Sequence, residues 1–536
     1  MDGHALQLLL DGFAVALTPQ NLMIAFFGAV IGTFVGMMPG IGPINGIVVL
    51  IPLAFAMDLS ATQMLILFAG IYYGAEYGNS ISAILINVPG TSAAVVTALE
   101  GNALARRGRA GPALATSALA SFFGSNVTLL AMMVAAPLLA RWAIKFGPAE
   151  YFALIVFAFS TLSSLAGANL AKGLIATVIG LMISTVGLDV MTGVPRYTFG
   201  NLRLYDGLDF VVVVIGFFAV NEVLRLTYDR IEGQNAINTL GRVFVPLREF
   251  FSKTGTLIRG AIIGFLVGIL PGAGAAIGAF IAYSTEKRIS GIKEDLFADT
   301  DDIRGVAAPE VANNAAVSGS LIPLLTLGVP GSGTTAVMLG ALLGLGITPG
   351  PLLIKNTPEI FWGLIAAMYI GNLMLLALNL PLVGIFVRVL NVPDWFLYPS
   401  VIAVSFVAVY AATNSTFDML LMAGIGVLGF FLHMVKLPLQ PVILGLILGP
   451  LMENNLRRAL TISRGDWGYL FVGGPPRYLT QFREAIGAGD LSVLSSLPLI
   501  CLGLWLLALL SLFLPLLLRR NASGKVVDVP MEGEAP

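Results

Sequence analysis

The sequence is poor in cysteine and in excess charge of either sign. Cys501 is the single cysteine among 536 residues, which excludes an intrachain disulfide and a cysteine-based metal site. The formal net charge is -1, so the chain lacks the basic excess that nucleic-acid binding requires. We therefore expect no nucleic-acid partner.

Charged residues are also scarce. They make up 11% of the chain, whereas hydrophobic residues make up 57%, and a soluble domain carries roughly 25% charged residues. Apolar runs long enough to span a bilayer, about 20 residues, recur along the chain, most clearly at 491–518. Runs such as 210–220 and 401–409 are apolar on every face, which favours helices over the alternating strands of a barrel. The sequence predicts an all-α polytopic membrane protein in the lipid bilayer, with about 10–14 helices, some broken or re-entrant.

Two segments repeat each other at identical spacing, which predicts two related halves. The repeated positions are Gly28, Gly32, Gly36, Pro39, Gly40, Gly42 and Gly46, then Gly260, Gly264, Gly268, Pro271, Gly272, Gly274 and Gly278. A second landmark follows in each half, Val88-Pro89-Gly90 and then Val329-Pro330-Gly331. Gly111-Pro112 and Gly350-Pro351 complete the order.

These landmarks divide the chain into six parts. Short loops rich in Lys and Arg tend to stay cytoplasmic, so the basic linker and the tail that begins at Arg519 and Arg520 are expected inside. The polar tail is expected to be disordered. The predicted parts are a first transmembrane repeat (1–228), a polar basic linker (229–255), a second transmembrane repeat (256–455), a loop (456–490), a final transmembrane helix (491–518) and the tail (519–536).

Each repeat contains a Pro-Gly pair inside an apolar helical run. Proline removes a backbone donor and glycine permits non-helical dihedrals, so Pro39-Gly40 and Pro271-Gly272 should each break a helix. Broken segments in two repeats are typical of a transporter's binding site, where freed carbonyl groups can coordinate Na⁺. The alternative is that the glycines only allow close helix packing, and we favour it for Gly28, Gly32, Gly260 and Gly264.

The second landmark places small hydroxyl residues directly after Pro-Gly. A helix restarting there would begin near a Ser or Thr cap, and its free N–H groups would form an anion site. Ordinary caps at a membrane surface are the alternative. Neither landmark contains Lys or Arg, so co-transported cations are an economical way to balance an anionic substrate. The substrate-binding candidates are Asn45, Asn87, Gly90, Thr91, Ser92, Ser318, Gly331, Ser332, Gly333, Thr334 and Thr335.

Ionisable residues inside apolar stretches are functional candidates. Glu76 and Glu310 lie in such stretches and could bind a proton or contribute to a Na⁺ site, although each could instead lie at a helix end in water. The ion-coupling or helix-breaking candidates are Pro39, Gly40, Gly42, Glu76, Asn79, Pro89, Pro271, Gly272, Gly274, Glu310, Asn313, Asn314 and Pro330. We expect no cofactor other than the coupling ion, Na⁺ or H⁺, and no catalytic residue.

Six sequence blocks together resemble the large membrane subunit of the tripartite tricarboxylate transporters, the TctA family. The blocks keep their order over roughly residues 20–355. They are GMMPGIGPING, YYGAEYGNSISAILINVPGTSAA, GRAGPALA, GILPGAGAAIGAF, APEVANNAAVSGSLIPLLTLGVPGSGTTAVMLGAL and GITPGPLL.

The resemblance implies a bacterial inner-membrane permease driven by an ion gradient. It further implies two partners, a small membrane subunit (TctB-like) and a periplasmic solute-binding protein (TctC-like). Family members are associated with citrate and other di- and tricarboxylates, but substrate choice rests heavily on the separate binding protein.

Two other functions remain open from the sequence. An intramembrane serine protease would need a pair such as Ser92 and His433 within hydrogen-bond reach. A passive anion channel would show rings of charge or of carbonyl groups built by symmetry. Two related halves within one chain fit an alternating-access transporter better than such a channel.

Overall fold

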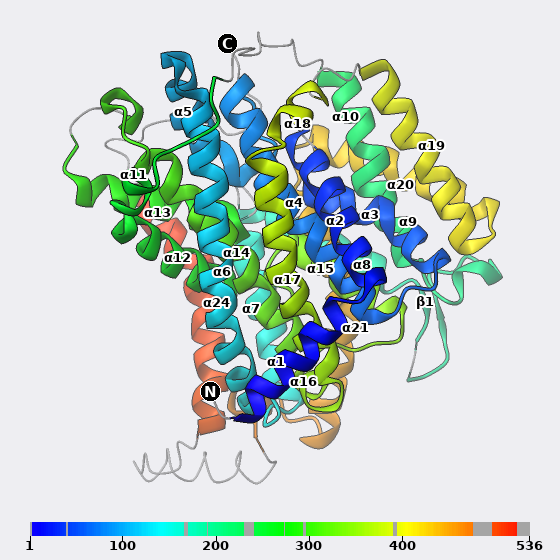
Figure 1. Ribbon diagram of the computed structural model, residues 1–536. Helices are drawn as coiled ribbons and strands as arrows, with labels where there is room; N and C mark the ends of the chain where they lie inside the picture. The colour runs from blue at the N-terminus through cyan, green and yellow to red at the C-terminus, as the bar shows by residue number, and fades with distance from the viewer. Residues whose placement is uncertain are drawn as a thin grey trace.

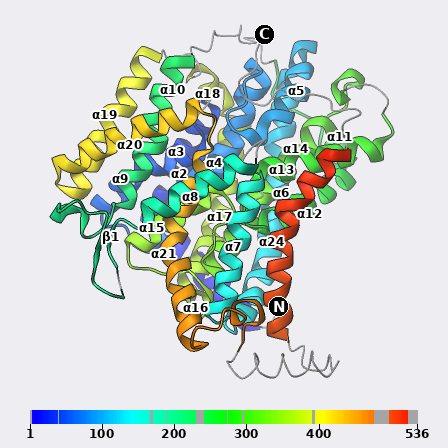
Figure 2. The same cartoon turned by 180° about the vertical axis from the view of Figure 1, so that it is seen from behind.

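The structure is a computed structural model that describes residues 3–38, 41–165, 170–189, 191–229, 241–272, 274–292, 296–389, 394–474 and 496–521. Helices account for most of these residues (Figures 1 and 2). Within the described ranges, the strands are one short antiparallel pair, β1 (Gly187–Leu188) and β2 (Pro195–Arg196). The predicted all-α fold is therefore confirmed. The predictions made for Pro39, Gly40, 230–240, 475–495 and the tail from 522 onward fall outside the described residues.

The described residues of the first half form ten α-helices and four short helical turns. They are α1 (Gly3–Ala16), α2 (Pro19–Met37), α3 (Gly42–Ala56), α4 (Ala61–Ile86), η1 (Ser92–Ala94), α5 (Val95–Leu104), η2 (Ala105–Arg109), α6 (Ala110–Ala143), α7 (Pro148–Leu165), α8 (Leu170–Ser184), η3 (Leu202–Leu204), α9 (Phe210–Ile215), η4 (Gly216–Val220) and α10 (Asn221–Asp229).

The remaining helices follow the linker. They are α11 (Leu247–Phe251), α12 (Thr254–Ile269), α13 (Gly274–Ser290), η5 (Phe297–Thr300), α14 (Arg304–Leu327), α15 (Gly333–Gly344), α16 (Pro351–Asn356), α17 (Pro358–Asn379), α18 (Val383–Val389), α19 (Asp394–Thr413), α20 (Thr416–Met434), α21 (Leu439–Ile462), α22 (Tyr469–Val472) and α24 (Ser496–Asn521). Helix α11 lies inside the predicted linker, and α21 continues through 456–462, the start of the predicted loop.

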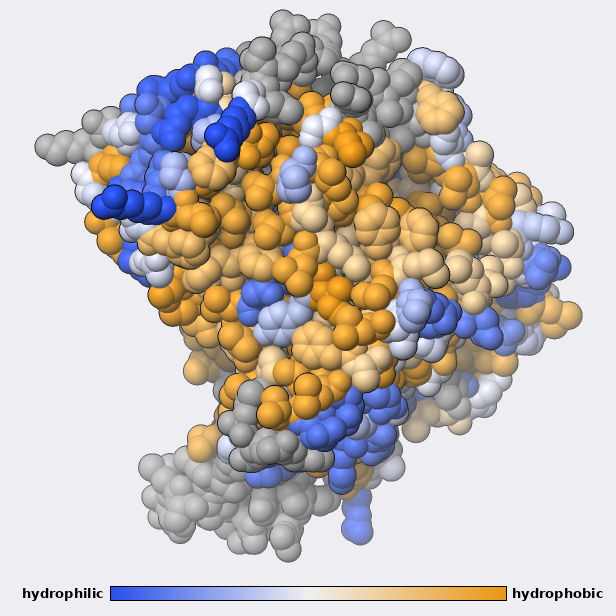
Figure 3. All heavy atoms as spheres, viewed as in Figure 1, coloured by the Kyte–Doolittle hydropathy of each residue, from blue (hydrophilic) through white to orange (hydrophobic). Residues whose placement is uncertain are grey.

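Among the described residues, five helical segments are long and apolar enough to cross a membrane. Apolar residues cover most of the face seen in Figure 3, and hydrophilic residues gather toward its two ends. This distribution is that of a polytopic membrane protein. The five segments are Pro19–Met37, Ser92–Ala143, Phe210–Tyr228, Pro358–Asn379 and Thr416–Met434.

The repeated glycines that precede the first break allow close helix packing in the same way in both halves. A Cβ added to Gly28 would lie 2.7 Å from the Leu67 carbonyl oxygen of α4, and one added to Gly260 would lie 3.1 Å from that of Ala308 in α14. A Cβ on Gly264 would lie 2.6 Å from the Ala312 Cα. The helix pairs α2–α4 and α12–α14 are therefore in backbone contact, as the packing interpretation of these glycines predicts.

The long helices that follow each second landmark cross to the other half. Helix α6 of the first half packs along α14 of the second, and α17 of the second half packs along α4 of the first. A Cβ on Gly124 of α6 would lie 2.5 Å from the Val311 carbonyl oxygen of α14. Because the exchange is reciprocal, the central helices α4 and α14 are each enclosed by both halves.

An ion-pair network ties the strand pair to the end of α21. The Asp189 carboxylate accepts backbone N–H groups of Met191 and Thr192, both at 2.9 Å, and pairs with Arg457 at 2.7 Å. The Thr192 amide and then the Arg457 guanidinium stabilise the ionised form, so the pKa of Asp189 lies well below its ordinary value. Arg457 also pairs with Glu453 one turn earlier. These pairs account for the continuation of α21 beyond the predicted end of the second repeat.

Candidate functional site

At the first break of each half, one helix ends and the next begins a few residues later. In the first half α2 ends at Met37, and α3 begins at Gly42 with φ +63°. In the second half α12 ends at Ile269, Gly272 has φ +82°, and α13 begins at Gly274 with φ +65°. These positive φ values lie in the left-handed region that favours glycine.

The second break begins in both halves with a left-handed helix cap. Asn87 ends α4 with φ 56°, and Gly328 ends α14 with φ 67°. After this point the halves differ. Ser332 caps α15 and exchanges hydrogen bonds with Thr335, 3.2 Å and 2.8 Å long, in a capping box. Thr91 lies at the equivalent place but makes no side-chain cap bond to the turn η1 that follows it.

The two breaks of each half lie against each other. The Gly272 N–H donates a 3.0 Å hydrogen bond to the Gly331 carbonyl oxygen. In the first half, a Cβ on Gly42 would lie 3.9 Å from the Thr91 methyl carbon, and Gly90 approaches the backbone of Gly36. Gly90 is therefore needed for close backbone approach, whereas Gly42 and Gly272 are needed for their dihedrals.

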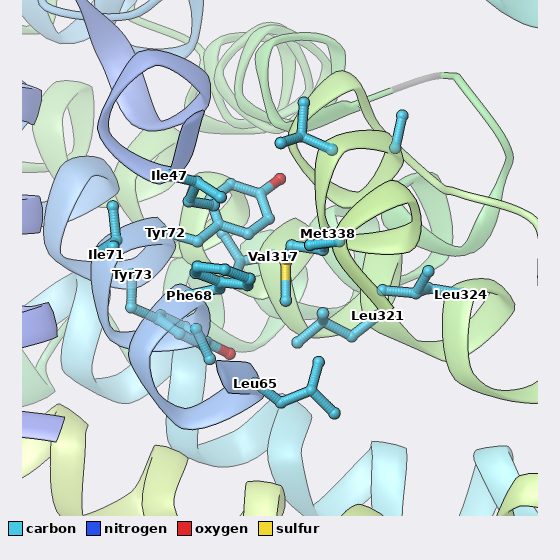
Figure 4. Close-up of a cluster of buried hydrophobic side chains, with 14 of the residues drawn as sticks. Ile47, Leu65, Phe68, Ile71, Tyr72, Tyr73, Val317, Leu321, Leu324 and Met338 are labelled. Carbon is cyan, nitrogen blue, oxygen red and sulfur yellow. The ribbon is translucent and has the colours of Figure 1, made fainter. Parts of the chain in front are cut away.

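The breaks also contact the opposite half. The turn η1 packs on α13, where Ala93, Ala275 and Ala316 form one cluster. Helix α15 packs on α3. Tyr72 of α4 joins the two halves directly, because its hydroxyl lies 3.1 Å from the Ser332 Oγ. Figure 4 shows Ile47, Phe68 and Met338 close to the Tyr72 side chain. Whether all four breaks line one substrate cavity stays a prediction.

Four polar side chains next to the second break form what we call the Glu76 cluster: Glu76, Asn79, Thr91 and Asn313. The Glu76 carboxylate accepts from Asn79 Nδ2 at 2.8 Å and from Thr91 Oγ1 at 3.3 Å, and Asn79 Nδ2 also donates to Thr91 Oγ1 at 2.7 Å. Asn313 reaches the cluster from the second half through a 3.4 Å bond from its Nδ2 to the Glu76 carbonyl oxygen.

The Glu76 cluster has unused acceptor capacity. Asn79 and Asn313 are both 0% exposed, and Glu76 is 4% exposed. Within the described part of the chain, the Oδ1 atoms of Asn79 and Asn313 have no hydrogen-bond partner. Buried polar atoms normally find a partner, so two unsatisfied oxygens beside a buried carboxylate form a donor set suited to a hard cation.

Glu310 lies in a second polar cluster, on the side of α14 that faces α5 and α6. Its carboxylate accepts from Thr97 Oγ1 at 2.5 Å, Ser117 Oγ at 3.1 Å and Ser121 Oγ at 3.2 Å. Asn314 donates to Ser121 Oγ at 2.8 Å. Asn313 and Asn314 are adjacent in sequence but serve different clusters, because consecutive helical residues point about 100° apart. Neither Glu76 nor Glu310 lies at a helix end in water, the alternative that the sequence left open.

The other predicted residues occupy varied positions. Ser318 is fully buried and lies 2.6 Å from the Tyr73 hydroxyl and 2.8 Å from Thr128 Oγ1. Asn45 donates to the Ile41 carbonyl oxygen within the first turn of α3. Ser92 is exposed at the start of η1. Gly333 and Thr334 form the first turn of α15, while Pro89 and Pro330 lie in the links between the helices.

Sequence reasoning did not select Tyr72, Thr97, Ser117 or Ser121. The two serines could have been found, because Ser117, Ser121, Ser125 and Thr128 recur on one face of an otherwise apolar helix. Tyr72 and Thr97 carry no such local signal, since their partners Ser332 and Glu310 lie in the other half.

Comparison with known proteins identifies the family of this chain. The model of the family described as "Tripartite tricarboxylate transporter TctA family" matches residues 22–444. A relative from Agrobacterium vitis, titled "Uncharacterized 52.8 kDa protein in TAR-I ttuC' 3'region", is 45% identical over 464 residues, which cover 87% of this chain and 91% of the relative.

A second Agrobacterium vitis relative matches a shorter part of the chain. It is titled "Uncharacterized protein in TAR-II ttuC' 3'region" and is 45% identical over 212 residues, covering 40% of this chain and 86% of the relative. No solved structure shows a significant match. Because the family match spans most of the chain and includes both breaks of each half, the chain belongs to the tripartite tricarboxylate transporter TctA family.

Proposed function

We propose that this chain is the permease subunit of a binding-protein-dependent secondary transporter that imports citrate-like di- and tricarboxylates or related small organic anions. It works in the bacterial inner membrane with a TctB-like small membrane subunit and a TctC-like periplasmic solute-binding protein. An inward gradient of Na⁺ or H⁺ drives uptake. Family membership supports the transporter class, and the contacts between the two halves support the mechanism.

The observation that carries the proposal is the 3.1 Å contact between Tyr72 and Ser332. It joins the central helix of one half to the N-cap of a broken helix in the other. In transporters built from repeats, substrate binds at such an interface, and access alternates as one repeat moves against the other. A substrate placed between these residues would therefore contact both moving parts.

Carboxylate binding is assigned to the start of α15. The Ser332 and Thr335 hydroxyls are partly used by the capping box, but the N–H groups of Gly333 and Thr334 are among the first four of the helix, which have no partner within it. The positive end of the helix dipole attracts an anion there. Recognition by N–H and hydroxyl groups fits a site whose motifs contain no Lys or Arg.

The coupling ion is assigned to the Glu76 cluster, and we propose Na⁺. The Glu76 carboxylate, the Thr91 hydroxyl and the unsatisfied Oδ1 atoms of Asn79 and Asn313 supply the oxygen ligands. An ionised Glu76 without a cation would repel an anionic substrate near Tyr72 on the same helix. Filling the cluster with Na⁺ removes that repulsion, which couples binding of the two solutes.

Reconstitution tests the proposal. The chain, its small membrane subunit and the loaded binding protein are placed in liposomes, and uptake of radiolabelled citrate and dicarboxylates is followed with imposed Na⁺ or H⁺ gradients. We expect uptake only when a gradient is present. Uptake that ignores both gradients would remove the coupling claim, and a binding screen on the periplasmic partner would identify the substrate.

The two alternatives make different predictions. A channel does not accelerate exchange, so faster entry of labelled substrate into liposomes preloaded with unlabelled substrate would exclude the passive anion channel. A serine protease would lose activity when His433 is replaced, whereas transport should continue. Membership in a transporter family favours transport over catalysis.

The arrangement of positive charge supports the proposed orientation, with the C-terminus in the cytoplasm. Both ribbon views place the C-terminal end of α24 on the same side of the molecule as α11 (Figures 1 and 2). On that side Arg107 pairs with Asp299 and Arg109 pairs with Glu249 of α11. Short basic loops tend to remain cytoplasmic.

A further inference from the structure

The helix α6 carries a row of buried hydroxyl groups that the proposed substrate and Na⁺ sites do not use. Ser117, Ser121, Ser125 and Thr128 share one face of the helix, and each is at most 2% exposed. We call these four residues the hydroxyl row. It lies along α14, where Glu310, Asn314 and Ser318 follow each other at one-turn spacing. Polar groups buried within a membrane-spanning segment cost free energy and are usually functional.

Direct contacts connect most of the hydroxyl row to α14. At one end, Ser117 and Ser121 donate to the Glu310 carboxylate, and Asn314 donates to Ser121. At the other end, Thr128 Oγ1 lies 2.8 Å from Ser318 Oγ, which lies 2.6 Å from the Tyr73 hydroxyl. Each hydroxyl can donate and accept at the same time, so these groups can pass protons along the helix.

Ser125 lies in the middle of the row, where an ordered water would complete the path. Its Oγ is buried and has no hydrogen-bond partner among the described residues, and the same holds for Asn314 Oδ1. A water bound by two unsatisfied polar groups of this kind is a normal part of a protein interior. It would connect Ser121 and Thr128 into one continuous path.

Tyr73 opens the other end of the path to a cavity between α2, α4 and α17. The cavity is lined by Tyr73 and Asn372 together with small and apolar residues. Asn372 is 1% exposed and its Nδ2 lacks a hydrogen-bond partner within the described chain, while its Oδ1 accepts from the Tyr77 hydroxyl at 3.4 Å. An unused donor in this wall gives a water molecule a place to bind.

From these contacts we infer that Glu310 is a proton-binding site, loaded from the cavity at Tyr73 through the hydroxyl row and separate from the Na⁺ site at Glu76. In each transfer a hydroxyl oxygen accepts one proton and releases its own. The net reaction is addition of H⁺ to the Glu310 carboxylate, which changes its charge from -1 to zero. The coupling role of this proton rests on the proposed function, but proton binding itself does not.

The width of the path favours a proton over a metal ion. The backbones of α6 and α14 touch beside the row, as the 2.5 Å approach of a Cβ on Gly124 to the Val311 oxygen shows. A hydrated ion does not fit between helices packed this closely. The Glu310 carboxylate is 0% exposed, and among the described residues its side-chain oxygens accept from hydroxyl donors. A buried carboxylate that is not paired with a charge must be neutralised.

Other titratable groups lie on the elements packed against α14, and most of them have partners. Glu286 of α13 pairs with Arg259 of α12 and with Arg304 of α14. Glu100 of α5 accepts from Tyr283 of α13 and from two backbone N–H groups. The groups on α4 are Glu76, Tyr72, Tyr73 and Tyr77.

Infrared difference spectroscopy tests proton binding directly. The complete chain in lipid is cycled between high and low pH, and the carbonyl stretch of a protonated carboxylic acid is recorded in H₂O and D₂O. We expect a buried, deuterium-sensitive band that disappears in Glu310→Gln and persists in Glu286→Gln. A band that persists in Glu310→Gln, or one that Na⁺ removes at constant pH, would overturn the assignment.

A second measurement tests the path, using Ser121→Ala with Thr116→Val as its matched control. Thr116 lies on the same helix and is fully buried, but its hydroxyl has no hydrogen-bond partner in the described chain. In liposomes holding the full complex and a pH-sensitive dye, Ser121→Ala should slow proton-driven uptake at least about tenfold, because a bond to a charged group contributes about 1.5–3 kcal/mol. Thr116→Val should behave as the wild type.

The outcomes separate this inference from the proposed function. Na⁺-driven uptake that neither a pH gradient nor Glu310→Gln alters would overturn the coupling role of Glu310 and leave the proposed function standing. A wild-type complex that takes up no carboxylate would contradict the proposed function, whereas the infrared band would still report proton binding at Glu310.

Discussion

The amide of Gly272 donates a 3.0 Å hydrogen bond to the carbonyl oxygen of Gly331, joining the two helix breaks of the second half. One break follows α12 and the other precedes α15, so the bond fixes the link beside α13 relative to the N-cap at Ser332. Any movement of α12 and α13 is therefore transmitted to the proposed carboxylate site.

Substitution of Gly272 tests this connection. Its φ of +82° is unfavourable for residues with a side chain, so Gly272→Leu should abolish uptake while leaving membrane insertion intact. Gly272→Asn is the matched control, because asparagine tolerates left-handed dihedrals better, and it should retain partial activity. Wild-type uptake in Gly272→Leu would show that this break is not part of the site.

The Na⁺ assignment predicts a specific effect at Thr91. Thr91→Val keeps the size of the side chain but removes the hydroxyl that bonds to Glu76 and Asn79. The Na⁺ concentration for half-maximal uptake should rise about tenfold or more, the equivalent of one bond to a charged group. Thr91→Ser keeps the hydroxyl and should stay close to the wild type. Equal Na⁺ dependence in both variants would contradict the assignment.

Substitution of Tyr72 should change binding of the carboxylate substrate and leave binding of Na⁺ unchanged. Tyr72→Phe removes the contact with Ser332 and should raise the KM for the carboxylate several-fold, since one neutral hydrogen bond contributes about 0.5–1.5 kcal/mol. The half-maximal Na⁺ concentration should not change. Titrating uptake with the carboxylate and then with Na⁺ measures both values. A change in the half-maximal Na⁺ concentration alone would contradict the assignment of Tyr72 to the substrate site.

The repeated glycines of the packed helices should control the thermal stability of the folded chain. Gly32→Ala places a Cβ 2.9 Å from the Gly74 Cα of α4, and overpacking of this kind costs about 1–3 kcal/mol. Gly424→Ala in α20 is the matched control, because no atom lies within 4 Å of its added Cβ. Thermal unfolding in detergent should show a lower Tm for Gly32→Ala alone. Equal Tm values would mean that α2 and α4 can separate without penalty.

Acid should destabilise the segment around Asp189 that joins the two strands. The pKa of Asp189 is lower in the folded chain than in the unfolded chain, where it is about 3.9. Its contribution to stability is therefore complete above about pH 4 and is lost as the pH falls toward the folded value. Hydrogen exchange at Met191 and Thr192, corrected for the intrinsic pH dependence, should accelerate below about pH 4.

Removing the ion-pair partner should move that acid transition upward. Arg457→Gln takes away the guanidinium that bonds to Asp189 at 2.7 Å, so protonation should begin at higher pH and exchange should accelerate earlier. Arg464→Gln, beyond the end of α21, serves as the control. An unchanged transition in Arg457→Gln would show that the backbone N–H groups, together with Arg196 at 3.4 Å, are enough to stabilise the carboxylate.

Local chemistry explains why much of the fold could be predicted. Apolar runs identified helices because a bilayer leaves few other ways to satisfy the backbone. The repeated glycines marked close packing, and the links at Gly272 and Gly42 show the dihedrals that only glycine adopts easily. No local pattern predicts the ion pair between Arg457 near the end of α21 and Asp189, because the two residues lie far apart in sequence.

By itself, the sequence determined the helical class, the two related halves and the positions of the breaks, since each of these depends on neighbouring residues and their periodicity. Only the tertiary structure decided that Asn313 joins Glu76 while Asn314 joins Ser121, and that Tyr72 of one half reaches Ser332 of the other. The physical reason is that helix packing between the halves selects which buried polar groups meet, and no local pattern encodes that choice.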